Sequence, residues 1–358
     1  MVLKDLLKKI SETAGISGFE GNLREILQEE FRQRADEVWQ DNLGNLIALK
    51  KGTEDPGNRV MLAAHMDEIG LLVSGLEDNG FLRFTSARSF DIRILPGQEV
   101  TIAGTEPIKG IIGCRPPALQ TPEEAEKVVP LEELFIDTGL PQTEVERKIK
   151  VGDAISIRRE AVLLGKNFLA GKALDDRASV VVLLGILESL QKVKHDWHVY
   201  AVATVQEEVG LRGARVSTYQ IAPKVAVAID VTQGDMAGSS EESVFPLGKG
   251  PTIGVGPNIH PRLQELLIQV AKDYEIAYQI EPCGGLTGTD ARVIQVSREG
   301  VPTVLVSIPL RYMHSSVEVV HLSDIERAIK LIAAFISRLD DHPEWKQKEI
   351  IYPKRGGK

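Results

Sequence analysis

The stretch Thr204-Val205-Gln206-Glu207-Glu208-Val209-Gly210 places two adjacent carboxylates after an apolar run, residues 199–203, that predicts a buried strand. Glu207 and Glu208 are therefore expected where a central strand ends, before a turn made with Gly210. In an open α/β sheet, ligands bind at the carboxyl ends of the strands. Neighbouring side chains on an extended chain diverge, so one carboxylate can hold a metal while the other faces a substrate. For a lone Glu-Glu pair, a solvated acidic turn is the simpler interpretation.

The composition of the chain limits its class. With 358 residues, of which 43% are hydrophobic, it can form one large globular domain or two. A formal charge of −9 and the absence of a Lys/Arg cluster with interleaved aromatics argue against a nucleic-acid partner. Cys114 and Cys283 have no CxxC partner, which suits a reducing compartment. No signal peptide or membrane-length apolar run is apparent, so we expect a cytoplasmic protein without a membrane partner.

Two parts of the chain differ in pattern. Residues 1–70 and 165–358 alternate strands with helices, which predicts a discontinuous α/β domain with a mainly parallel sheet flanked by helices. Residues 71–164 carry short β-like runs between Gly and Pro turns, which predicts a small β-rich domain inserted into that parent. Ser323-Asp324-Ile325-Glu326 is typical of a capping box that opens the last long helix.

Other polar residues share the predicted position of the Glu-Glu pair. They follow predicted strands or open a predicted helix, and they are His65, Asp67, Asp175, Asp230 and His314. Each alone has an ordinary explanation as a turn residue or a helix N-cap. Their recurrence at one edge of a single predicted sheet is harder to produce by accident, and it predicts a functional site.

The chemistry of this set indicates metal-assisted hydrolysis. Two imidazoles with three carboxylates match the ligands of a dinuclear Zn, Co or Mn site, in which two ions share a carboxylate and a water. Asp67 lies two residues after His65, which suits a carboxylate that accepts the imidazole N–H and fixes its tautomer. The Glu that is not a ligand supplies the general base that the water needs. We therefore expect amide hydrolysis.

Five motifs, in this order, resemble those of the M42 metallo-aminopeptidases, the tetrahedral aminopeptidases related to glutamyl aminopeptidase and to CelM-like chains. The motifs are His65-Met66-Asp67, Gly171-Lys172-Ala173-Leu174-Asp175-Asp176-Arg177, Val205-Gln206-Glu207-Glu208-Val209-Gly210, Asp230-Val231-Thr232 and Arg311-Tyr312-Met313-His314-Ser315. The resemblance covers nearly the whole chain, and it implies an aminopeptidase that removes N-terminal residues from short peptides.

The resemblance also implies a role for each site residue. It implies five metal ligands: His65 and His314 as terminal ligands of one ion each, Asp175 as the bridge, Glu208 on one ion and Asp230 on the other. Glu207 would be the base, and Asp67 would orient His65. Asp175 is preferred to Asp176 because the family's motif places the bridging carboxylate at the first acidic position.

Cofactor and assembly follow from the same resemblance. It implies two divalent ions per subunit, Zn or Co before Mn, and an inserted β domain that mediates dimerisation. Dimers of the family assemble into a hollow tetrahedral dodecamer that admits peptides rather than folded proteins.

Three alternatives remain open from the sequence. A metal-dependent deacylase or carboxypeptidase acting on N-acyl amino acids would use the same kinds of metal ligand. A glycosidase needs two carboxylates beside a sugar and usually an aromatic platform, but aromatics make up only 5% of the chain. A structural shell without activity would not need an intact ligand set. The preferred N-terminal residue, whether acidic, basic or aliphatic, is not fixed by the sequence.

Overall fold

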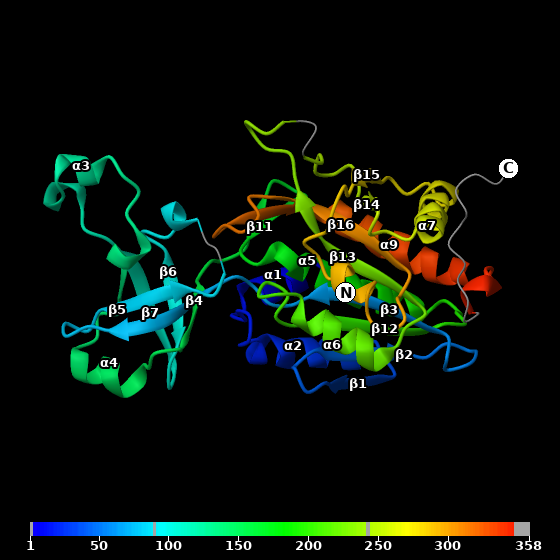
Figure 1. The fold of residues 1–358 in the computed structure, drawn as a ribbon, viewed down its shortest axis with the longest axis horizontal. Helices are drawn as coiled ribbons and strands as arrows, with labels where there is room; N and C mark the ends of the chain where they lie inside the picture. The colour runs from blue at the N-terminus through cyan, green and yellow to red at the C-terminus, as the bar shows by residue number, and fades with distance from the viewer. Residues whose placement is uncertain (1–2, 89–90, 241–243, 347–358) are drawn as a thin grey trace.

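Four apolar runs form the parallel centre of a large sheet. The strands β12 (His198–Thr204), β3 (Arg59–His65), β13 (Val225–Gln233) and β16 (Thr303–Arg311) pair in that order and are almost entirely buried. Strands covered on both faces are apolar throughout rather than alternating. Their parallel alignment brings their carboxyl ends to one edge of the sheet (Figure 1). This computed structural model describes residues 3–88, 91–240 and 244–346.

The outer strands make the sheet mixed. They are β1 (Glu37–Gln40), β2 (Leu46–Lys50), β10 (Val162–Leu164), β11 (Phe168–Gly171), β14 (Thr252–Val255), β15 (Gln279–Pro282) and β17 (Glu318–His321). Among the strand pairs of this sheet in the described residues, four are parallel and six antiparallel. The mainly parallel arrangement that we predicted is therefore confined to the centre. Two of the six antiparallel pairs, β1–β2 and β10–β11, follow from connections that are too short for a parallel crossover.

Helices cover both faces of this sheet. Those of the α/β body are α1 (Leu3–Glu12), α2 (Gly21–Arg32), α5 (Leu174–Leu190), α6 (Arg212–Ile221), α7 (Pro261–Asp273), α8 (Ala291–Ile294) and α9 (Leu322–Leu339). One face carries α5, on which α1 and α9 pack, and the other carries α6 with α8 (Figure 1). A 3₁₀ turn, Pro343–Lys346, follows α9.

Helix α5 is the centre of one helical layer. Its apolar residues face all directions, and residues 174–187 are all buried, as expected for a helix enclosed by the core. Gly185 permits the close approach of α9, because a Cβ there would lie 2.3 Å from Ile329 Cδ1. The helix that begins with Asp175 and Asp176 is thus fixed by packing along its length.

The start of α9 differs from the predicted capping box. The N-cap is His321, whose Nδ1 accepts the N–H of Ser323 at 3.3 Å. Asp324 is fully buried and accepts the N–H groups of Gly248 and Gly250 at 2.6 and 2.8 Å. The capping-box prediction was wrong because the helix begins at Leu322, so Ser323 lies within its first turn and His321 takes the N-cap position that the box requires of Ser323.

A second, smaller unit is a closed barrel with its own apolar core. Its strands are β4 (Leu71–Leu76), β5 (Leu82–Ser86), β6 (Glu99–Ala103), β7 (Pro107–Gly113), β8 (Phe135–Asp137) and β9 (Ala154–Ile157). Short helices α3 (Pro122–Ala125) and α4 (Gln142–Lys148) and 3₁₀ turns at Ile92–Ile94, Pro117–Leu119 and Leu131–Glu133 fill its connections.

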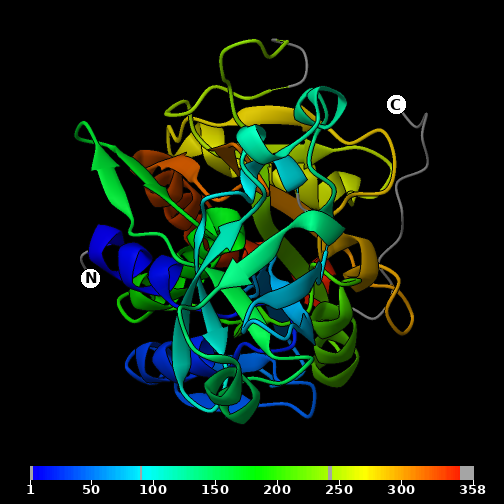
Figure 2. The ribbon, with the colours of Figure 1, turned by 90° about the vertical axis from the view of Figure 1, so that its left-hand side faces the viewer.

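The barrel projects from one end of the α/β body (Figure 1), and Figure 2 views the molecule from that end. The barrel core runs from Leu71 to Ile157. β10 lies within the 71–164 segment that we predicted as the insert, but it pairs with β11 in the large sheet. Barrel strands therefore end with β9, seven residues before the predicted boundary at residue 164.

A buried ion network joins the barrel, the segment that follows β3, and the beginning of α5. Lys172 Nζ lies 2.7 and 2.6 Å from the two carboxylate oxygens of Glu68, whose Oε1 is 3.3 Å from Arg177 Nη2. Ser156 of β9 donates to the same carboxylate at 3.1 Å. Burial is the main cause that lowers the pKa of Lys172 to about 8. Arg177 also donates to the main-chain oxygens of Ile10, Ser11 and Thr13, so the network ties four segments together.

Removing Glu68 should be costly. We expect Glu68→Ala to lower the free energy of unfolding by about 3–5 kcal/mol, because Lys172 and Arg177 would stay buried without their counter-ion. Denaturant unfolding measures this change. The matched control is Glu160→Ala, which removes the exposed ion pair between Glu160 and Lys8, 3.2 Å apart. This variant should change the free energy of unfolding by less than about 1 kcal/mol. Equal effects of the two variants would contradict the assigned role of the network.

Among the described residues, no helix is long and apolar enough to cross a membrane.

Candidate metal centre

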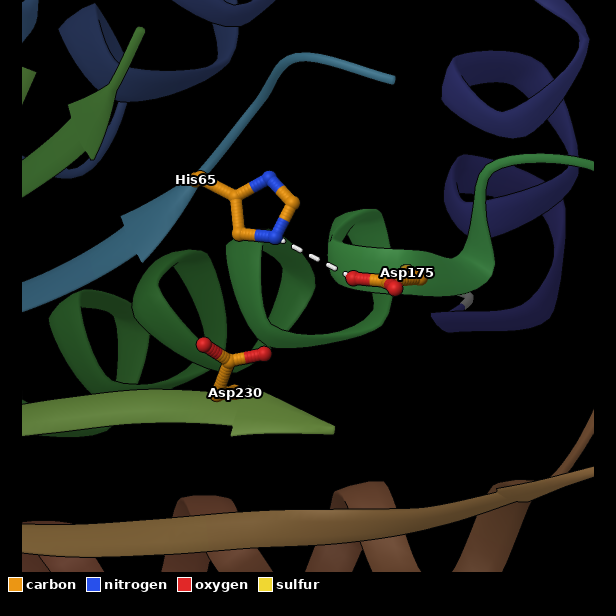
Figure 3. Close-up of side chains that lie close together, drawn as sticks. All are labelled: His65, Asp175 and Asp230. Carbon is orange, nitrogen blue, oxygen red and sulfur yellow. Dashed lines mark hydrogen bonds and ion pairs between the residues drawn. The ribbon is translucent and has the colours of Figure 1, made fainter. Parts of the chain in front are cut away.

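Three elements bring the first group of predicted ligands together. His65 is the last residue of β3, Asp175 lies in the first turn of α5, and Asp230 lies within β13. Figure 3 shows their side chains directed towards a common space. One ligand atom from each lies within 4.8 Å of the others, and His65 Nε2 is 3.1 Å from Asp175 Oδ1. The three side chains are buried, so the site is enclosed by protein.

A second group shares Asp175. His314 Nε2 lies 3.2 Å from Asp175 Oδ2 and 3.2 Å from Glu208 Oε1. The two oxygens of Asp175 therefore face different imidazoles, one from each group. Glu207 and Glu208 also form a third grouping with His65. Glu207 Oε2 is 4.0 Å from His65 Nε2. All five predicted ligands and the predicted base thus meet at this edge of the sheet.

Asp67 holds the turn that presents the two glutamates. Its Oδ1 accepts the N–H of Glu207 at 3.0 Å, its Oδ2 accepts the N–H of Glu208 at 3.2 Å, and Ser17 Oγ donates to Oδ2 at 2.6 Å. We predicted that its carboxylate accepts the imidazole N–H of His65. In the structure, His65 Nδ1 lies 3.1 Å from the main-chain oxygen of Asp67 and 3.6 Å from Oδ1. The nearer partner of the ring is thus the carbonyl.

Asp175 and Asp176 occupy different positions. Both have non-helical backbone angles at the start of α5, and the peptide bond between them is cis. Asp176 Oδ2 accepts the main-chain N–H of His65 at 3.2 Å. Asp176 belongs to none of the metal-ligand groups in the described part of the chain, whereas Asp175 belongs to two. This geometry favours Asp175 as the shared carboxylate.

The electrostatics of the site fit a cation. Burial, with the neighbouring charges of Asp230, Asp290 and Glu208, raises the pKa of Glu207 to about 10. Hydrogen bonds to Asp175 and Glu208 raise the pKa of His314 to about 10. Carboxylates crowded in a buried space repel one another, and divalent cations remove that repulsion. Three-residue groups of imidazole nitrogens and carboxylate oxygens are also the donors that Zn²⁺ and related ions prefer. The residues therefore fit a metal centre.

Glu318 is a site residue that the sequence did not reveal. Its Oε2 accepts the N–H of Asp175, and its Oε1 accepts the N–H of His314, both at 3.0 Å. The carboxylate is buried, and it fixes the main chain of residues from both ligand groups. His314 has a φ of 59°, a conformation that non-glycine residues adopt only when their surroundings stabilise it. The contact between Glu318 and Asp175 spans 143 positions, so no local sequence pattern indicates it.

Arg88 is a second residue that sequence patterns missed. It follows β5 of the barrel, and its Nη1 lies 2.8 Å from Glu208 Oε2 and 2.7 Å from the main-chain oxygen of Glu208. The inserted unit thus contributes a cation to the edge of the centre. A lone arginine in a β-rich segment carries no sequence signal for such a role.

A cavity of about 380 Å³ adjoins these residues. Its walls include the end of β13, the segment from Glu281 to Thr289, and Met313. Ligand pockets of this kind occur at the carboxyl ends of strands in α/β sheets. The ligand groups therefore have room for a substrate beside them.

Comparisons with known proteins agree with this geometry. The family profile described as M42 glutamyl aminopeptidase matches residues 44–331. This chain belongs to the M42 family. A lysyl aminopeptidase of Pyrococcus furiosus is 38% identical over 95% of this chain and 98% of its own. An aminopeptidase structure from the archaeon Desulfurococcus kamchatkensis has a TM-score of 0.90 at 41% identity, covering 98% of this chain and 99% of that one.

A third relative is informative about assembly. The TET1 peptidase of Pyrococcus horikoshii, whose structures are described as a tetrahedron or a large octahedral shell, matches with a TM-score of 0.83 at 34% identity. The match covers 93% of this chain and 99% of that chain. As an M42 protein, the chain is an enzyme, an aminopeptidase that hydrolyses peptides at their N-termini, and M42 enzymes depend on metal.

Removing the carboxylate of Glu318 should weaken metal binding. We expect Glu318→Ala to raise the Kd for the metal about 10–100-fold, the range typical of residues that orient ligands. Calorimetric titration of the metal-stripped protein measures this change. Glu326→Ala, on the exposed side of α9, is the matched control and should leave the Kd unchanged. A wild-type Kd in Glu318→Ala would show that the main chain of Asp175 and His314 keeps its position without this carboxylate.

Proposed function

We propose that this M42 aminopeptidase uses two divalent metal ions per subunit to remove N-terminal residues from short peptides. The observation that carries the proposal is Asp175, whose two oxygens face His65 and His314 at 3.1 and 3.2 Å. A carboxylate between two imidazoles, each with a further carboxylate close by, is the arrangement expected of a bridging ligand in a two-ion site.

The ligand sets follow from the two groups that share Asp175. His65 and Asp230 would complete one set, and His314 and Glu208 the other. When bound, the pair of ions would polarise the scissile carbonyl and lower the pKa of a water. Zn and Co are the metals that we expect first, with Mn as a third option, because imidazole and carboxylate ligands suit all three.

Glu207 is the proposed general base. It lies beside His65 but outside the two proposed ligand sets, and it is 4% exposed. Its carboxylate would take a proton from the attacking water and return it to the nitrogen of the leaving amine. Asp67 would keep it in place through the N–H groups of Glu207 and Glu208.

The geometry gives less support to the other functions. A glycosidase usually presents an aromatic surface on which a sugar stacks, and the described residues that line the cavity include no Phe, Tyr or Trp. A deacylase or carboxypeptidase for N-acyl amino acids would use the same ligands. Substrates with free and acetylated amines distinguish that activity from an aminopeptidase.

We also infer how copies of the chain associate. The barrel within residues 71–164 is proposed as the dimerisation domain, and dimers would build a tetrahedral dodecamer. The structures of the TET1 peptidase, which include a tetrahedral assembly, support self-association. Exposed apolar side chains also support it, since Ile111 of the barrel and Val162, Leu163 and Leu164 of β10 are each 45–55% exposed.

Activity assays with metal reconstitution test the proposed function. Metal-stripped enzyme should hydrolyse free aminoacyl-p-nitroanilides only after Zn, Co or Mn is added, and it should leave the acetylated copies intact. Hydrolysis of the acetylated set would make the chain a deacylase. Full activity of the stripped enzyme, with metal content verified by elemental analysis, would refute the metal-dependent reaction.

The Glu207→Gln variant tests the base. We expect kcat to fall about 10²-fold or more, because the amide cannot accept the proton, while the metal content stays at the wild-type value. Steady-state kinetics and elemental analysis on the same preparation measure both quantities. The matched control is Glu299→Gln, at an exposed position, which should keep the wild-type kcat. An unchanged kcat in Glu207→Gln would rule out this assignment.

A further inference from the structure

One wall of the cavity carries a carboxylate that belongs to neither proposed ligand set. Glu281 lies on β15, and two threonine hydroxyls fix its side chain. Thr232 Oγ1 donates to Oε1 at 2.8 Å, and Thr252 Oγ1 donates to Oε2 at 2.5 Å. Both threonines are buried, whereas Glu281 is partly exposed and lines the cavity. The carboxylate is therefore held rigidly at a surface that a substrate can reach.

This carboxylate has capacity left for a cation. An ionised carboxylate offers about four acceptor positions, of which the two hydroxyls use two. Within residues 3–88, 91–240 and 244–346, Glu281 forms no ion pair with Lys, Arg or His. The other charged wall residue outside the centre is Arg88, and its guanidinium is bound to Glu208. The cavity thus offers an uncompensated negative charge and a positive charge that is already paired.

The position of Glu281 suits a long side chain. Its partner Thr232 is two residues beyond Asp230 on β13, so it lies on the same face of the strand, about 7 Å further along. Apolar wall residues, Leu305 and Met313 among them, lie in the same cavity. A side chain with an aliphatic stem and a charged end packs its stem on apolar surface while its end binds a carboxylate.

We propose that Glu281 makes the enzyme select substrates whose N-terminal residue is cationic, Lys or Arg, over acidic ones. The proposal rests on the proposed aminopeptidase reaction at the metal centre. The ammonium or guanidinium group of the substrate binds the free acceptor positions of Glu281 in a charge-assisted hydrogen bond. An acidic side chain in the same place meets repulsion from a carboxylate that two buried hydroxyls prevent from turning away. Glu281 is a specificity-determining residue and takes no part in the chemical step.

Matched substrates isolate the charge. Lysyl-p-nitroanilide and norleucyl-p-nitroanilide have similar unbranched stems, but only lysine carries the ammonium. We expect wild-type kcat/KM to favour lysine over norleucine by at least about tenfold, since a charge-assisted hydrogen bond is lost with norleucine. In Glu281→Gln, which is nearly isosteric and keeps an acceptor for one threonine, this ratio should fall to near one. The ratio for glutamyl- over norleucyl-p-nitroanilide should rise in the same variant.

A binding measurement and a control complete the test. Free L-lysine should inhibit the wild type more strongly than L-norleucine, and Glu281→Gln should remove the difference. Glu265→Gln, at an exposed position on α7, is the matched control and should keep the wild-type ratios. A wild type that cleaves both substrates equally, or a variant that lowers all rates by the same factor, would overturn the selectivity and leave the aminopeptidase reaction standing. A wild type that cleaves neither aminoacyl substrate would refute the proposed function itself.

Discussion

The centre depends on how one buried carboxylate, Asp175, is held between two imidazoles. Its oxygens lie 3.1 Å from His65 and 3.2 Å from His314, and the segments that carry these residues are far apart in the chain. A buried anion is tolerated only where partners offset the loss of hydration. Glu318 adds a second constraint, because it accepts the N–H of Asp175 and of His314 and so fixes the two backbones relative to each other.

Charged networks around the centre supply the rigidity that such a site requires. Glu68 follows Asp67 and binds Lys172 and Arg177, which flank the Asp175 motif. A buried ion network contributes little net stability, but losing one partner is costly, so it strongly disfavours alternative arrangements. Positive φ angles at Gln206 and His314 are sustained in the same region. Strained backbone of this kind clusters at active sites, where the surrounding contacts over-determine it.

The two units of the fold meet at the cavity. The sheet contributes the ligand residues and Glu281, while the barrel contributes Arg88, which pairs with Glu208 at 2.8 Å. Ser156 of the barrel binds Glu68 of the α/β body, so the barrel is anchored next to the centre and not only through its chain connections. Any shift of the barrel would therefore change the electrostatic environment of the Glu207-Glu208 turn.

Local pattern was sufficient for much of this protein. Apolar runs that end in polar residues predicted the central strands, and parallel alignment predicted that residues such as His65 and Asp230 meet at one edge. The short β-like runs between Gly and Pro turns in residues 71–164 predicted a β-rich insert, although β10 of that segment lies in the large sheet. The antiparallel flanks were missed because the apolar pattern of a strand does not indicate which strand it pairs with or in which direction, except where a connection as short as β1–β2 or β10–β11 requires antiparallel pairing. The capping box at Ser323 was wrong because the helix begins one residue earlier, at Leu322, with His321 as its N-cap.

The sequence by itself determined the types and order of the site residues, since hydrophobic periodicity and turn chemistry act over a few positions. Only the tertiary structure decided which oxygens and nitrogens face each other. It places Asp175 in two of the groups of potential ligands, and it brings Glu318, Arg88 and Glu281 to the site. Four of the contacts concerned, Asp175–Glu318, Asp175–His314, Arg88–Glu208 and Thr232–Glu281, join residues more than 40 positions apart. Their geometry is fixed by the packing of whole elements, which no local pattern records.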